Sequence, residues 1–540
     1  MGTYLDSASA YTLYRSETEA PYFVDKTMLL AELFPLVRSG NRHICITRPR
    51  RFGKTVAANM VSAFFGKGAD SRELFSSLQV AQVPGFLENL NQYHVVHIDF
   101  SLTDDICMDY AQYIGAVKTL LKEDLSDAYP QVDFRENSPV YEDFLRVFNK
   151  TGDRFLFVLD EWDAVFHMSF MTEQDKRSYL LFLKGLLKDK PYVSLTYMTG
   201  ILPIAKYSSG SELNMFYEYK MSSEEKYSEY FGFLDCEVDR LFDKYRNLCT
   251  GRQRVTREGL RLWYDGYQTK SGTRVYNPRS VVLALANNNL TGYWTSSGPY
   301  DEIFHYIRQN TDGVKKDLSL MIAGESVEAD IHEYAANAME LRTRDEIFSA
   351  MVVYGFLSCR EGKVSIPNRE LMDQFSEMIR NRTELGYINR LAAESGKMLA
   401  ATLRGDTKTV DEVLAFAHDT EVPLFSYNSE AELSAIVNLS YLSARDAYRV
   451  EREDKAGIGY VDFIFYPYKK DADCIILELK VDSTPKQAIR QIRERKYDLR
   501  FYGKPGEELC FTGRILAVGI SYFRDTKRHQ CEIEVLREAL

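Results

Sequence analysis

The chain has 540 residues, a formal net charge of −11, 45% hydrophobic residues and 27% charged residues. This length is too great for one hydrophobic core, so we expect about two to four domains. The acidic balance argues against non-specific coating of nucleic acid by the whole surface, although it is compatible with a local basic groove. These fractions are ordinary for a soluble globular protein.

The cysteines and the apolar runs do not suggest an exported or membrane protein. The eight cysteines are scattered and form no C-x-x-C pair, so we expect neither a zinc site nor a disulfide scaffold. Residues 1–19 lack the apolar core of a signal peptide, and no apolar run approaches the roughly 20 residues that a membrane helix needs. We expect a soluble, cytoplasmic protein without a membrane partner.

Hydrophobic periodicity predicts helices and strands in the first part of the chain. The apolar spacing over 29–37 suits a helix that Pro35 kinks or ends. The pattern then predicts a strand over 43–46, a helix over 56–65 and strands over 93–100, 154–160 and 192–198. We expect an α/β domain here.

The stretch Arg48-Pro-Arg-Arg-Phe-Gly-Lys-Thr55 lies between the first strand and the helix that follows it. A loop that leaves a strand and opens a helix points backbone N–H groups and the positive helix end at one spot, where polyphosphate binds. Gly53 lets the backbone approach the phosphates, Lys54 would reach the terminal phosphates, and the Thr55 hydroxyl would ligate Mg²⁺. The usual pattern G-x-x-x-x-G-K-[ST] begins with glycine where this chain has Arg48. We interpret the stretch as a variant phosphate loop; the alternative is a basic turn before an ordinary helix.

Two acids end the strand predicted over 154–160. An apolar run followed by Asp160 and Glu161 is what a nucleotide hydrolase needs at the carboxyl end of a buried parallel strand. The first carboxylate would hold Mg²⁺ through water, and the second would polarise the attacking water. Strands often end in acids, but the phosphate loop upstream makes this pair more specific. Thr199, at the end of the strand over 192–198, could sense the γ-phosphate or could be part of a simple turn.

The order F-V-D-K, I-T-R-P-R-R-F-G-K-T, V-L-D-E-W-D and T-G-I-L-P-I-A-K resembles a family of predicted AAA-type ATPases fused to a PD-(D/E)XK nuclease domain, common in bacteria and archaea. In that family an arginine-rich loop without the first glycine is usual, and Trp162 stands here where Tyr is common. The resemblance implies ATP binding at the loop, metal coordination by Asp160 and water activation by Glu161. The residues we assign to the nucleotide site are Arg51, Phe52, Gly53, Lys54, Thr55, Asp160 and Thr199, with Thr55 and Asp160 as metal ligands.

From about residue 230 to 422 the pattern is mostly helical, with aromatic residues beside Gly or Pro in turns at 263–267, 275–278 and 293–298. The resemblance implies that this region packs against the ATPase. These aromatic residues could contact nucleotide or nucleic acid, but we favour a role in pinning loops to the core. A helix over 347–357 followed by a short strand over 363–366 suggests a winged-helix-like hairpin.

Near the end of the chain, two strand patterns carry acids. Residues 459–466 carry Asp462, and residues 474–480 carry Glu478 and Lys480. Side chains at i and i+2 on a strand point to one face, so Glu478 and Lys480 project together. If the strands pair as a hairpin, Asp462 joins them, and the two carboxylates could hold Mg²⁺, which lowers the pKa of a bound water. Lys480 would position that water and stabilise the developing anion. A solvated strand face is the alternative, although the strand is otherwise apolar.

This arrangement, D-x(n)-E-x-K, resembles the core of PD-(D/E)XK phosphodiesterases, in which a glutamine and a tyrosine on the next helix line the site. The helix that we predict over 485–499 is basic, which suits phosphate contacts, although a solvated helix is nearly as well supported. The expected nucleic-acid contacts are Gln487, Arg490, Gln491 and Tyr497. A leading helix over 429–442 could add Glu430 or Glu432, although the aromatic-histidine pair that is usual there in the family is absent.

We therefore predict an α/β chain with three parts: an AAA-like P-loop NTPase domain over 1–225, a mostly helical region over 226–420 and a restriction-endonuclease-like domain over 421–540. The expected activity is ATP hydrolysis coupled to Mg²⁺-dependent cleavage of nucleic acid, DNA rather than RNA, with Mn²⁺ as an alternative to Mg²⁺ at the nuclease site. Catalysis is assigned to Glu161, Asp462, Glu478 and Lys480. The alternative is a nucleotide-dependent switch that binds nucleic acid or a partner without cutting. A homo-oligomer would be needed if an arginine acts in trans.

Overall fold

The computed structural model describes residues 2–102, 107–204, 212–221, 224–294, 307, 313–322, 324–331, 341, 343–381, 387–418, 430–456, 459–501 and 511–540. The chain forms two compact units. The first comprises Met1–Thr295, Asp330–Gly362 and Pro367–Glu370, and the second comprises Ser296–Ala329, Lys363–Ile366 and Leu371–Leu540. The three domain ranges expected from the sequence stay predictions.

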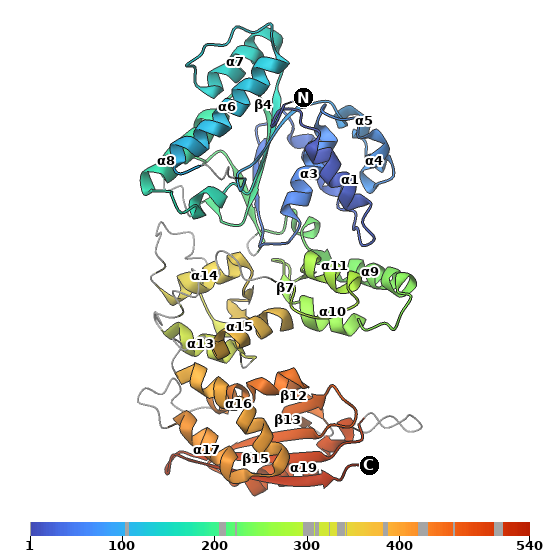
Figure 1. The fold of residues 1–540 in the computed structure, drawn as a ribbon, viewed down its shortest axis with the longest axis vertical. Helices are drawn as coiled ribbons and strands as arrows, with labels where there is room; N and C mark the ends of the chain where they lie inside the picture. The colour runs from blue at the N-terminus through green and yellow to red at the C-terminus, as the bar shows by residue number, and fades with distance from the viewer. Residues whose placement is uncertain are drawn as a thin grey trace. The chain divides into compact units, whose positions relative to one another are not determined.

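The first unit is built on a five-stranded parallel sheet in the order β2-β3-β4-β1-β5 (Figure 1). Its strands are β1 (His43–Thr47), β2 (His94–Asp99), β3 (Phe155–Asp160), β4 (Val193–Gly200) and β5 (Tyr217–Lys220). The strands β1, β3 and β4 are fully buried, as expected for parallel strands that are covered on both faces. The four strands that the sequence predicts in this region are confirmed, and so is the α/β class.

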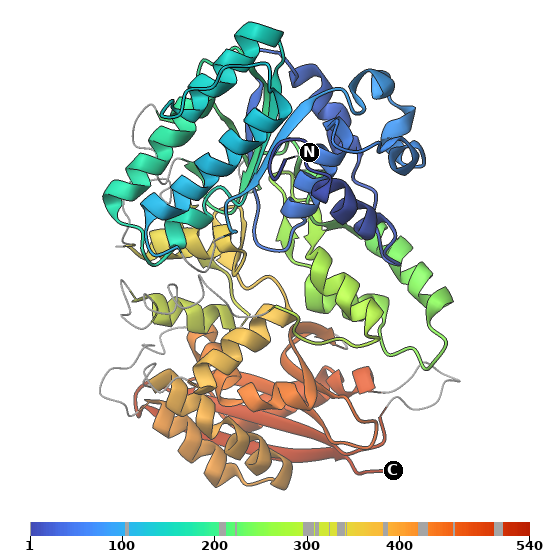
Figure 2. The same ribbon diagram turned by 45° about the horizontal axis from the view of Figure 1, so that its top comes forward.

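Helices cover both faces of this sheet. Figures 1 and 2 show α1 (Ser9–Thr18) and α3 (Lys54–Phe65) on one side, and α6 (Tyr110–Ala128), α7 (Val140–Thr151) and α8 (Glu173–Leu187) on the other. The starts of α6 and α8 are capped by Asp109 and Thr172, whose side chains accept backbone N–H groups of the first turn. The shorter helices are α2 (Met28–Leu33), α4 (Arg72–Ser76) and α5 (Phe86–Asn89). As predicted from Pro35, α2 ends at Leu33 and a 3-10 turn follows.

The rest of the first unit is mainly helical. It contains α9 (Asp235–Leu248), α10 (Arg257–Tyr264), α11 (Pro278–Ala286) and α14 (Arg344–Tyr354), and the short strands β6 (Phe233–Leu234), β7 (Tyr267–Gln268), β8 (Arg274–Tyr276) and β10 (Ser358–Arg360). The turn aromatics Tyr264, Tyr267 and Tyr276 are buried. The burial of these three supports a role in pinning loops to the core, whereas Trp263 and Tyr293 are only partly buried and residues 295–298 of the third turn lie outside the described residues.

The second unit contains a five-stranded mixed sheet in the order β12-β13-β14-β15-β16, whose β14 and β15 are parallel and whose other pairs are antiparallel. Its strands are β12 (Tyr448–Ala456), β13 (Gly459–Pro467), β14 (Cys474–Val481), β15 (Ile515–Phe523) and β16 (Arg528–Arg537). A separate antiparallel pair joins β9 (Val327–Glu328) to β11 (Lys363–Ser365). The helices are α13 (Val314–Ile322), α15 (Arg369–Asn381, which begins in the first unit), α16 (Tyr387–Arg404), α17 (Thr407–His418), α18 (Glu430–Ser440) and α19 (Pro485–Glu494).

The two faces of this mixed sheet pack against different helices. Ile464 and Ile476, which are paired in register on β13 and β14, join a core with Ile489 and Ile492 of α19. The neighbouring Phe465 points to the opposite face, where its ring lies 5.2 Å from that of Tyr441 after α18. Asp462 and Glu478 each lie two residues from these isoleucines, so their side chains point to the same face of the sheet, toward α19.

One helix boundary was predicted wrongly. The sequence suggests one helix over 485–499, but α19 ends at Glu494 and a 3-10 turn occupies Tyr497–Phe501. The break coincides with Lys496, which has a left-handed backbone with φ of 53°. Within the described part of the chain, no helix combines the length and the apolar character needed to cross a membrane.

Candidate functional site

The phosphate loop of the first unit has the backbone that close approach to an anion requires. Gly53 and Arg51 both adopt left-handed conformations, with φ of 88° and 69°, and α3 starts immediately afterwards at Lys54. A left-handed residue costs little at glycine and more at arginine, so the Arg51 conformation is held by its surroundings. The loop therefore presents the first turn of α3 at the carboxyl edge of the sheet, next to the end of β1.

Arg48, at the position where the usual loop pattern has glycine, is a structural anchor. Its side chain is only 1% exposed and donates hydrogen bonds of 2.8 Å to the carbonyls of Thr47 and Tyr219. The guanidinium also lies 5.1 Å from the centre of the Phe231 ring. Burial lowers the pKa of Arg48 to about 10, which leaves it charged at neutral pH. Arg48 thus ties the start of the loop to the edge strand β5.

Lys54 and Glu161 face each other across the loop. The Lys54 ammonium lies 3.7 Å from the Glu161 carboxylate and 3.3 Å from the Pro49 carbonyl, and its side chain is 3% exposed. Glu161 follows β3 in a left-handed conformation with φ of 47°, which turns its carboxylate toward the loop. A bound phosphate could replace either partner of Lys54, so the ammonium is placed for the role that the sequence predicts.

Asp160 ends β3 as a fully buried carboxylate with one oxygen unsatisfied. Its Oδ1 accepts the backbone N–H of Glu161 at 3.0 Å, and its Oδ2 has no hydrogen-bond partner. Burial raises the pKa of Asp160 to about 7, and the Glu161 and Asp99 carboxylates raise it further, while the Thr55 hydroxyl and the Lys54 ammonium act in the opposite direction. A carboxylate in this state is stabilised by a nearby cation. The donor pair of Thr55 and Asp160 therefore fits Mg²⁺.

Thr199 lies at the end of β4 with its hydroxyl buried and without a hydrogen-bond partner. The turn after it is fixed by Asp163, which accepts the backbone N–H groups of Ile201 and Leu202 at 3.1 and 2.7 Å. Gly200 is needed there because a Cβ would lie 2.3 Å from Asp163 Oδ1. The turn is therefore built around Asp163. The buried Thr199 hydroxyl has no partner, and its role as a γ-phosphate sensor stays a prediction.

A cavity of about 540 Å³ opens in front of the phosphate loop. Arg51, Phe52, Gly53, Lys54, Thr55 and Glu161 line it at the loop end. Aromatic and aliphatic side chains form much of the remaining wall, among them Tyr22, Phe23, Met60, Tyr230 and Phe233. A polar end with cations and an apolar wall match the phosphates and the base of a nucleotide.

In the second unit, the strands that carry the acids pair as predicted. The antiparallel register of β13 and β14 joins Phe463 to Leu477, which puts Asp462 opposite Glu478. Asp462 is half-buried and accepts the backbone N–H of Leu479 at 2.6 Å. Lys480 donates to Glu478 Oε1 at 3.1 Å. The three residues that the sequence assigns to nuclease catalysis, Asp462, Glu478 and Lys480, therefore lie together on one face of the sheet.

Glu478 is the most buried member of this group. The residue is only 3% exposed. Its Oε1 accepts hydrogen bonds from Lys480 and from the side-chain amide of Gln491, and its Oε2 has no hydrogen-bond partner. Burial raises the pKa of Glu478 to about 7, and the Asp462 carboxylate adds to the rise while Lys480 opposes it. Two neighbouring carboxylates, one with an unsatisfied oxygen, form a donor set that fits a divalent metal.

Two family models match the chain over these two sites. A family described as "Predicted AAA-ATPase" matches residues 12–209, and the PD-(D/E)XK nuclease superfamily matches residues 430–526. The chain joins an AAA-ATPase-like domain to a PD-(D/E)XK nuclease superfamily domain. The resemblance on which the sequence assignments rest is thereby confirmed.

A curated relative and two solved structures are also similar. A protein of Azotobacter chroococcum, described as uncharacterized and encoded in the vnfD 5′ region, is 26% identical over 285 residues, which are 51% of this chain and 51% of the relative. The match thus spans about half the length of that relative. A Walker-type ATPase of Pyrococcus abyssi shares 11% identity with a TM-score of 0.36, over 64% of this chain and 93% of its own. The ORC2 protein of Aeropyrum pernix shares 10% identity with a TM-score of 0.33, over 68% and 92%.

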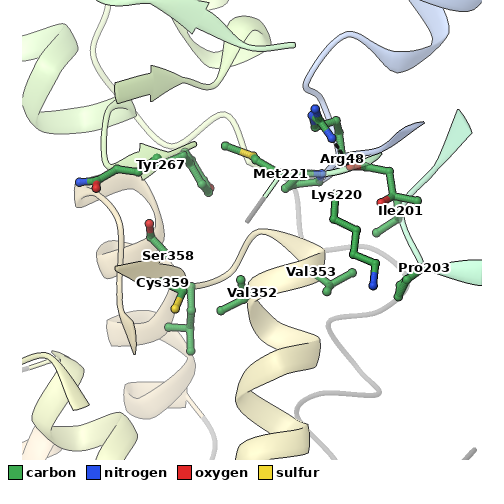
Figure 3. A pocket seen from close by; sticks show the side chains of 14 residues that line it. Arg48, Ile201, Pro203, Lys220, Met221, Tyr267, Val352, Val353, Ser358 and Cys359 are labelled. Carbon is green, nitrogen blue, oxygen red and sulfur yellow. Dashed lines mark hydrogen bonds between the residues drawn. The ribbon is translucent and has the colours of Figure 1, made fainter. Parts of the chain in front are cut away.

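A second, smaller cavity lies behind the phosphate loop of the AAA-ATPase-like domain. It measures about 60 Å³, and its walls come from β5, β7, α14, β10 and the ends of β1 and β4 (Figure 3). Lys220, Tyr267, Val352 and Cys359 are among the side chains that line it. A water molecule occupies about 30 Å³ in the liquid, so this space holds a few waters at most. This space is therefore too small for a nucleotide, and the larger cavity is the candidate nucleotide site.

The four residues expected to contact nucleic acid lie in different surroundings in the PD-(D/E)XK domain. Gln487 and Arg490 are exposed on α19, whereas Gln491 is half-buried and bonded to Glu478. Tyr497 has no exposed surface and belongs to the core beneath α19. The structure thus brings Gln491 to the acidic group and leaves Gln487 and Arg490 free to meet solvent. The side chains of Glu430 and Glu432, the candidates for an extra acid, lie outside the described residues.

No described group of three or more His, Cys, Asp or Glu side chains is arranged to hold a metal ion. Each candidate metal position therefore rests on fewer protein ligands: Thr55 with Asp160, and Asp462 with Glu478. This is the usual situation for Mg²⁺, which keeps several waters and takes further ligands from substrate phosphates.

Among the residues that sequence reasoning missed are a cation of the nucleotide cavity, Arg279, and the carboxylate that fixes the turn after β4, Asp163. Arg279 lines the cavity from the start of α11, and Asp163 organises the turn after β4. Arg279 had a sequence signal, because Asn277 caps α11 and Pro278 opens it, so the next residue lies in the first turn of a helix. Asp163 belonged to a recognised motif, but its partners lie 38 and 39 residues away and no local pattern shows them.

Proposed function

We propose that this chain is an ATP-regulated, Mg²⁺-dependent nuclease that cleaves DNA. The AAA-ATPase-like domain would bind and hydrolyse ATP, and the PD-(D/E)XK domain would cut phosphodiester bonds. The observation that carries the nuclease part is the register of β13 and β14, which supports a two-carboxylate centre with Lys480 beside it. The coupling of the two activities is proposed because both sites lie on one chain.

ATP would bind with its phosphates at the loop end of the cavity. Lys54 would exchange its contacts with Pro49 and Glu161 for phosphate oxygens, and Glu161 would then be free to orient the attacking water. Thr55 and Asp160 would hold Mg²⁺, whose positive charge neutralises charge on the phosphates being separated. Arg279, which lines the cavity, and Thr199, whose buried hydroxyl has no partner, would respond to the terminal phosphate.

Arg279 comes from the same chain as the loop, so a second copy is not needed to bring an additional arginine to this cavity. The homo-oligomer anticipated for an arginine acting in trans stays a prediction. Sedimentation with and without ATP would check it.

Cleavage would take place at the Asp462 and Glu478 carboxylates. A divalent metal held there lowers the pKa of a bound water and offsets charge on the phosphate. Lys480, already fixed against Glu478, would orient the attacking water and stabilise the negative charge that develops on the phosphate oxygens. Gln491 would keep Glu478 in position through its amide.

Nucleic acid is the proposed substrate class because the exposed side of α19 is basic although the whole chain is acidic, and DNA rather than RNA is the expectation carried over from the sequence. Lys486, Arg490 and Arg493 are exposed along this helix, which reaches Glu478 through Gln491, and Arg493 also pairs with Glu534. Lysine and arginine contacts to phosphates release counterions, so binding should weaken steeply with salt. The residues give no preference between one strand and two.

Gating can be tested separately from cleavage. Lys54→Ala should abolish ATP binding and remove the effect of ATP on the cleavage rate, as two conformations with different affinities for ATP would require. The assay would follow labelled linear DNA with Mg²⁺, with and without ATP. If Lys54→Ala loses ATP binding while the cleavage rate and its ATP response stay those of the natural protein, gating by this site is wrong.

The rival function is a nucleotide-dependent switch whose PD-(D/E)XK domain binds nucleic acid or a partner without cutting. Titration with Mg²⁺ and Mn²⁺ separates the two. A nuclease should bind a divalent metal at Asp462 and Glu478 in the presence of DNA, and Asp462→Ala should remove this binding. Metal binding too weak to detect, together with tight DNA binding, would favour the switch.

A further inference from the structure

Glu370, at the start of α15, is a buried carboxylate that no proposed reaction step uses. Its side chain has no exposed surface. It accepts the backbone N–H groups of Tyr293 and Trp294 at 2.5 and 2.7 Å, and the hydroxyl of Ser280 at 2.9 Å. Within the described residues it forms no direct ion pair with lysine or arginine. A buried carboxylate is costly unless hydrogen-bond donors surround it. The three donors around Glu370 offset that cost.

Each of the two segments that Glu370 binds adjoins or contacts an arginine of the nucleotide cavity. Ser280 follows Arg279 in α11, and Arg279 lines the cavity. Tyr293 offers its carbonyl to the Arg51 guanidinium, which also lies 5.7 Å from the centre of the Trp294 ring. Arg51 belongs to the phosphate loop and lines the same cavity. One carboxylate thus fixes the supports of two cavity arginines that are 228 residues apart, from position 51 to position 279.

The charges in this group are mutually dependent. Burial lowers the pKa of Arg51, and the positive charge of Arg279 lowers it further, so the two guanidinium groups are close enough to repel. Burial raises the pKa of Glu370, while its three donors and the Arg51 charge act in the opposite direction. Without a negative group nearby, two neighbouring cations would tend to separate. Glu370 supplies that negative charge from outside the cavity, as a bound polyphosphate would from inside.

We infer that Glu370 is a positioning residue of the nucleotide site, which holds Arg51 and Arg279 where they meet the terminal phosphate of ATP. This inference rests on the proposed ATP site. ADP lacks the terminal phosphate, so the arrangement should favour ATP over ADP. Replacement of Glu370 by glutamine keeps the shape but removes the charge and turns an acceptor into a donor that faces N–H or O–H groups.

The test is the affinity of the full chain for Mg²⁺-ATP and Mg²⁺-ADP, measured by calorimetry for the natural protein and for Glu370→Gln. The matched control is Glu377→Gln, an exposed glutamate on the same helix. Glu370→Gln should weaken ATP binding about tenfold, which corresponds to about 1.4 kcal/mol. It should weaken ADP binding much less and leave the melting temperature within a few degrees. Glu377→Gln should change neither affinity.

Ser280→Ala provides a second variant in case Glu370→Gln folds poorly, because it removes one donor without changing charge. It should lower the ATP-to-ADP affinity ratio in the same direction, by a smaller factor. An unchanged ratio in both variants, or equal losses for both nucleotides, would overturn the inference and leave the ATP site standing. Failure of the natural protein to bind ATP would overturn the ATP site and the inference together.

Discussion

The Asp462 carboxylate accepts a 2.6 Å hydrogen bond from the backbone N–H of Leu479, the residue between Glu478 and Lys480. Asp462 is therefore held by the backbone of the strand that carries the other two residues. Two carboxylates kept side by side would repel, and burial adds to the cost at Glu478. The arrangement is one that a bound cation would stabilise.

Gln491 should affect the chemical step, and Gln487 should not. Gln491 donates to Glu478, whereas Gln487 lies one turn earlier on α19 and is exposed. Loss of a group that orients a metal ligand typically costs 10- to 100-fold, so Gln491→Ala should lower the single-turnover cleavage rate at saturating DNA by about tenfold or more. Gln487→Ala should raise KM for DNA and keep that rate. Equal effects on the rate would show that the bond to Glu478 has no part in cleavage.

Arg48 should be required for stability. Arg48→Ala would leave the Tyr219 carbonyl without its donor and open a space beside Phe231, so we expect a loss of about 2 to 4 kcal/mol. Arg48→Gly, which restores the usual loop pattern, should be no better. The measurement is the first thermal unfolding transition of the nucleotide-free chain. Arg15→Ala is the control, because its ion pair with Glu19 is exposed to solvent and should contribute little to stability. An Arg48→Ala transition as high as that of Arg15→Ala would contradict this role.

Asp160 should destabilise the nucleotide-free protein at neutral and alkaline pH. Burial raises its pKa from 3.8 to about 7, so between these values the folded chain retains a proton that the unfolded chain has released. Stability from this group therefore falls as pH rises through that window, and the loss is complete above about pH 7. Asp160→Asn should raise the melting temperature at pH 8 and change it little at pH 4. The same change in melting temperature at both pH values would be inconsistent with a raised pKa at Asp160.

Glu161 and Lys54 should separate hydrolysis from binding. Glu161→Gln keeps the shape beside Lys54 but removes the group that would polarise water, so ATP should still bind while hydrolysis falls by about 100-fold or more. Lys54→Ala should lose binding itself. Glu73→Gln, an exposed acid outside the cavity, serves as the control and should match the natural protein. ATP binding and hydrolysis are both measured with Mg²⁺ present. Undiminished hydrolysis by Glu161→Gln would remove Glu161 from the catalytic group.

The positions that depend on local patterns were predictable from the sequence. The phosphate loop, Asp160 and the two acid-bearing strands follow from apolar runs that end or alternate at defined residues, and the pairing of β13 with β14 is confirmed. Alternation along a strand determines which side chains share a face, so Glu478 and Lys480 could be placed together before Asp462 was seen to join them.

The positions that depend on distant partners were not predictable. Arg48 bonds to a carbonyl 171 residues away, and Glu370 meets Tyr293 from 77 residues away. Tyr497 was expected on the helix that lines the site, but the left-handed Lys496 ends that helix early and the ring lies in the core. A single backbone angle of this kind is chosen by tertiary packing, which outweighs the helical propensity of the surrounding residues.

The most direct test of the nuclease centre is cleavage of linear, circular and single-stranded DNA and of RNA by the full chain with Mg²⁺ or Mn²⁺, with and without ATP. Asp462→Ala and Lys480→Ala are compared with Asp471→Ala, an exposed acid in the turn between β13 and β14. We expect metal-dependent cutting of DNA by the natural protein and by Asp471→Ala, none by the other two variants, and a rate that responds to ATP. No cutting under any of these conditions, with ATP hydrolysis intact, would contradict the nuclease and favour a switch that binds without cleaving.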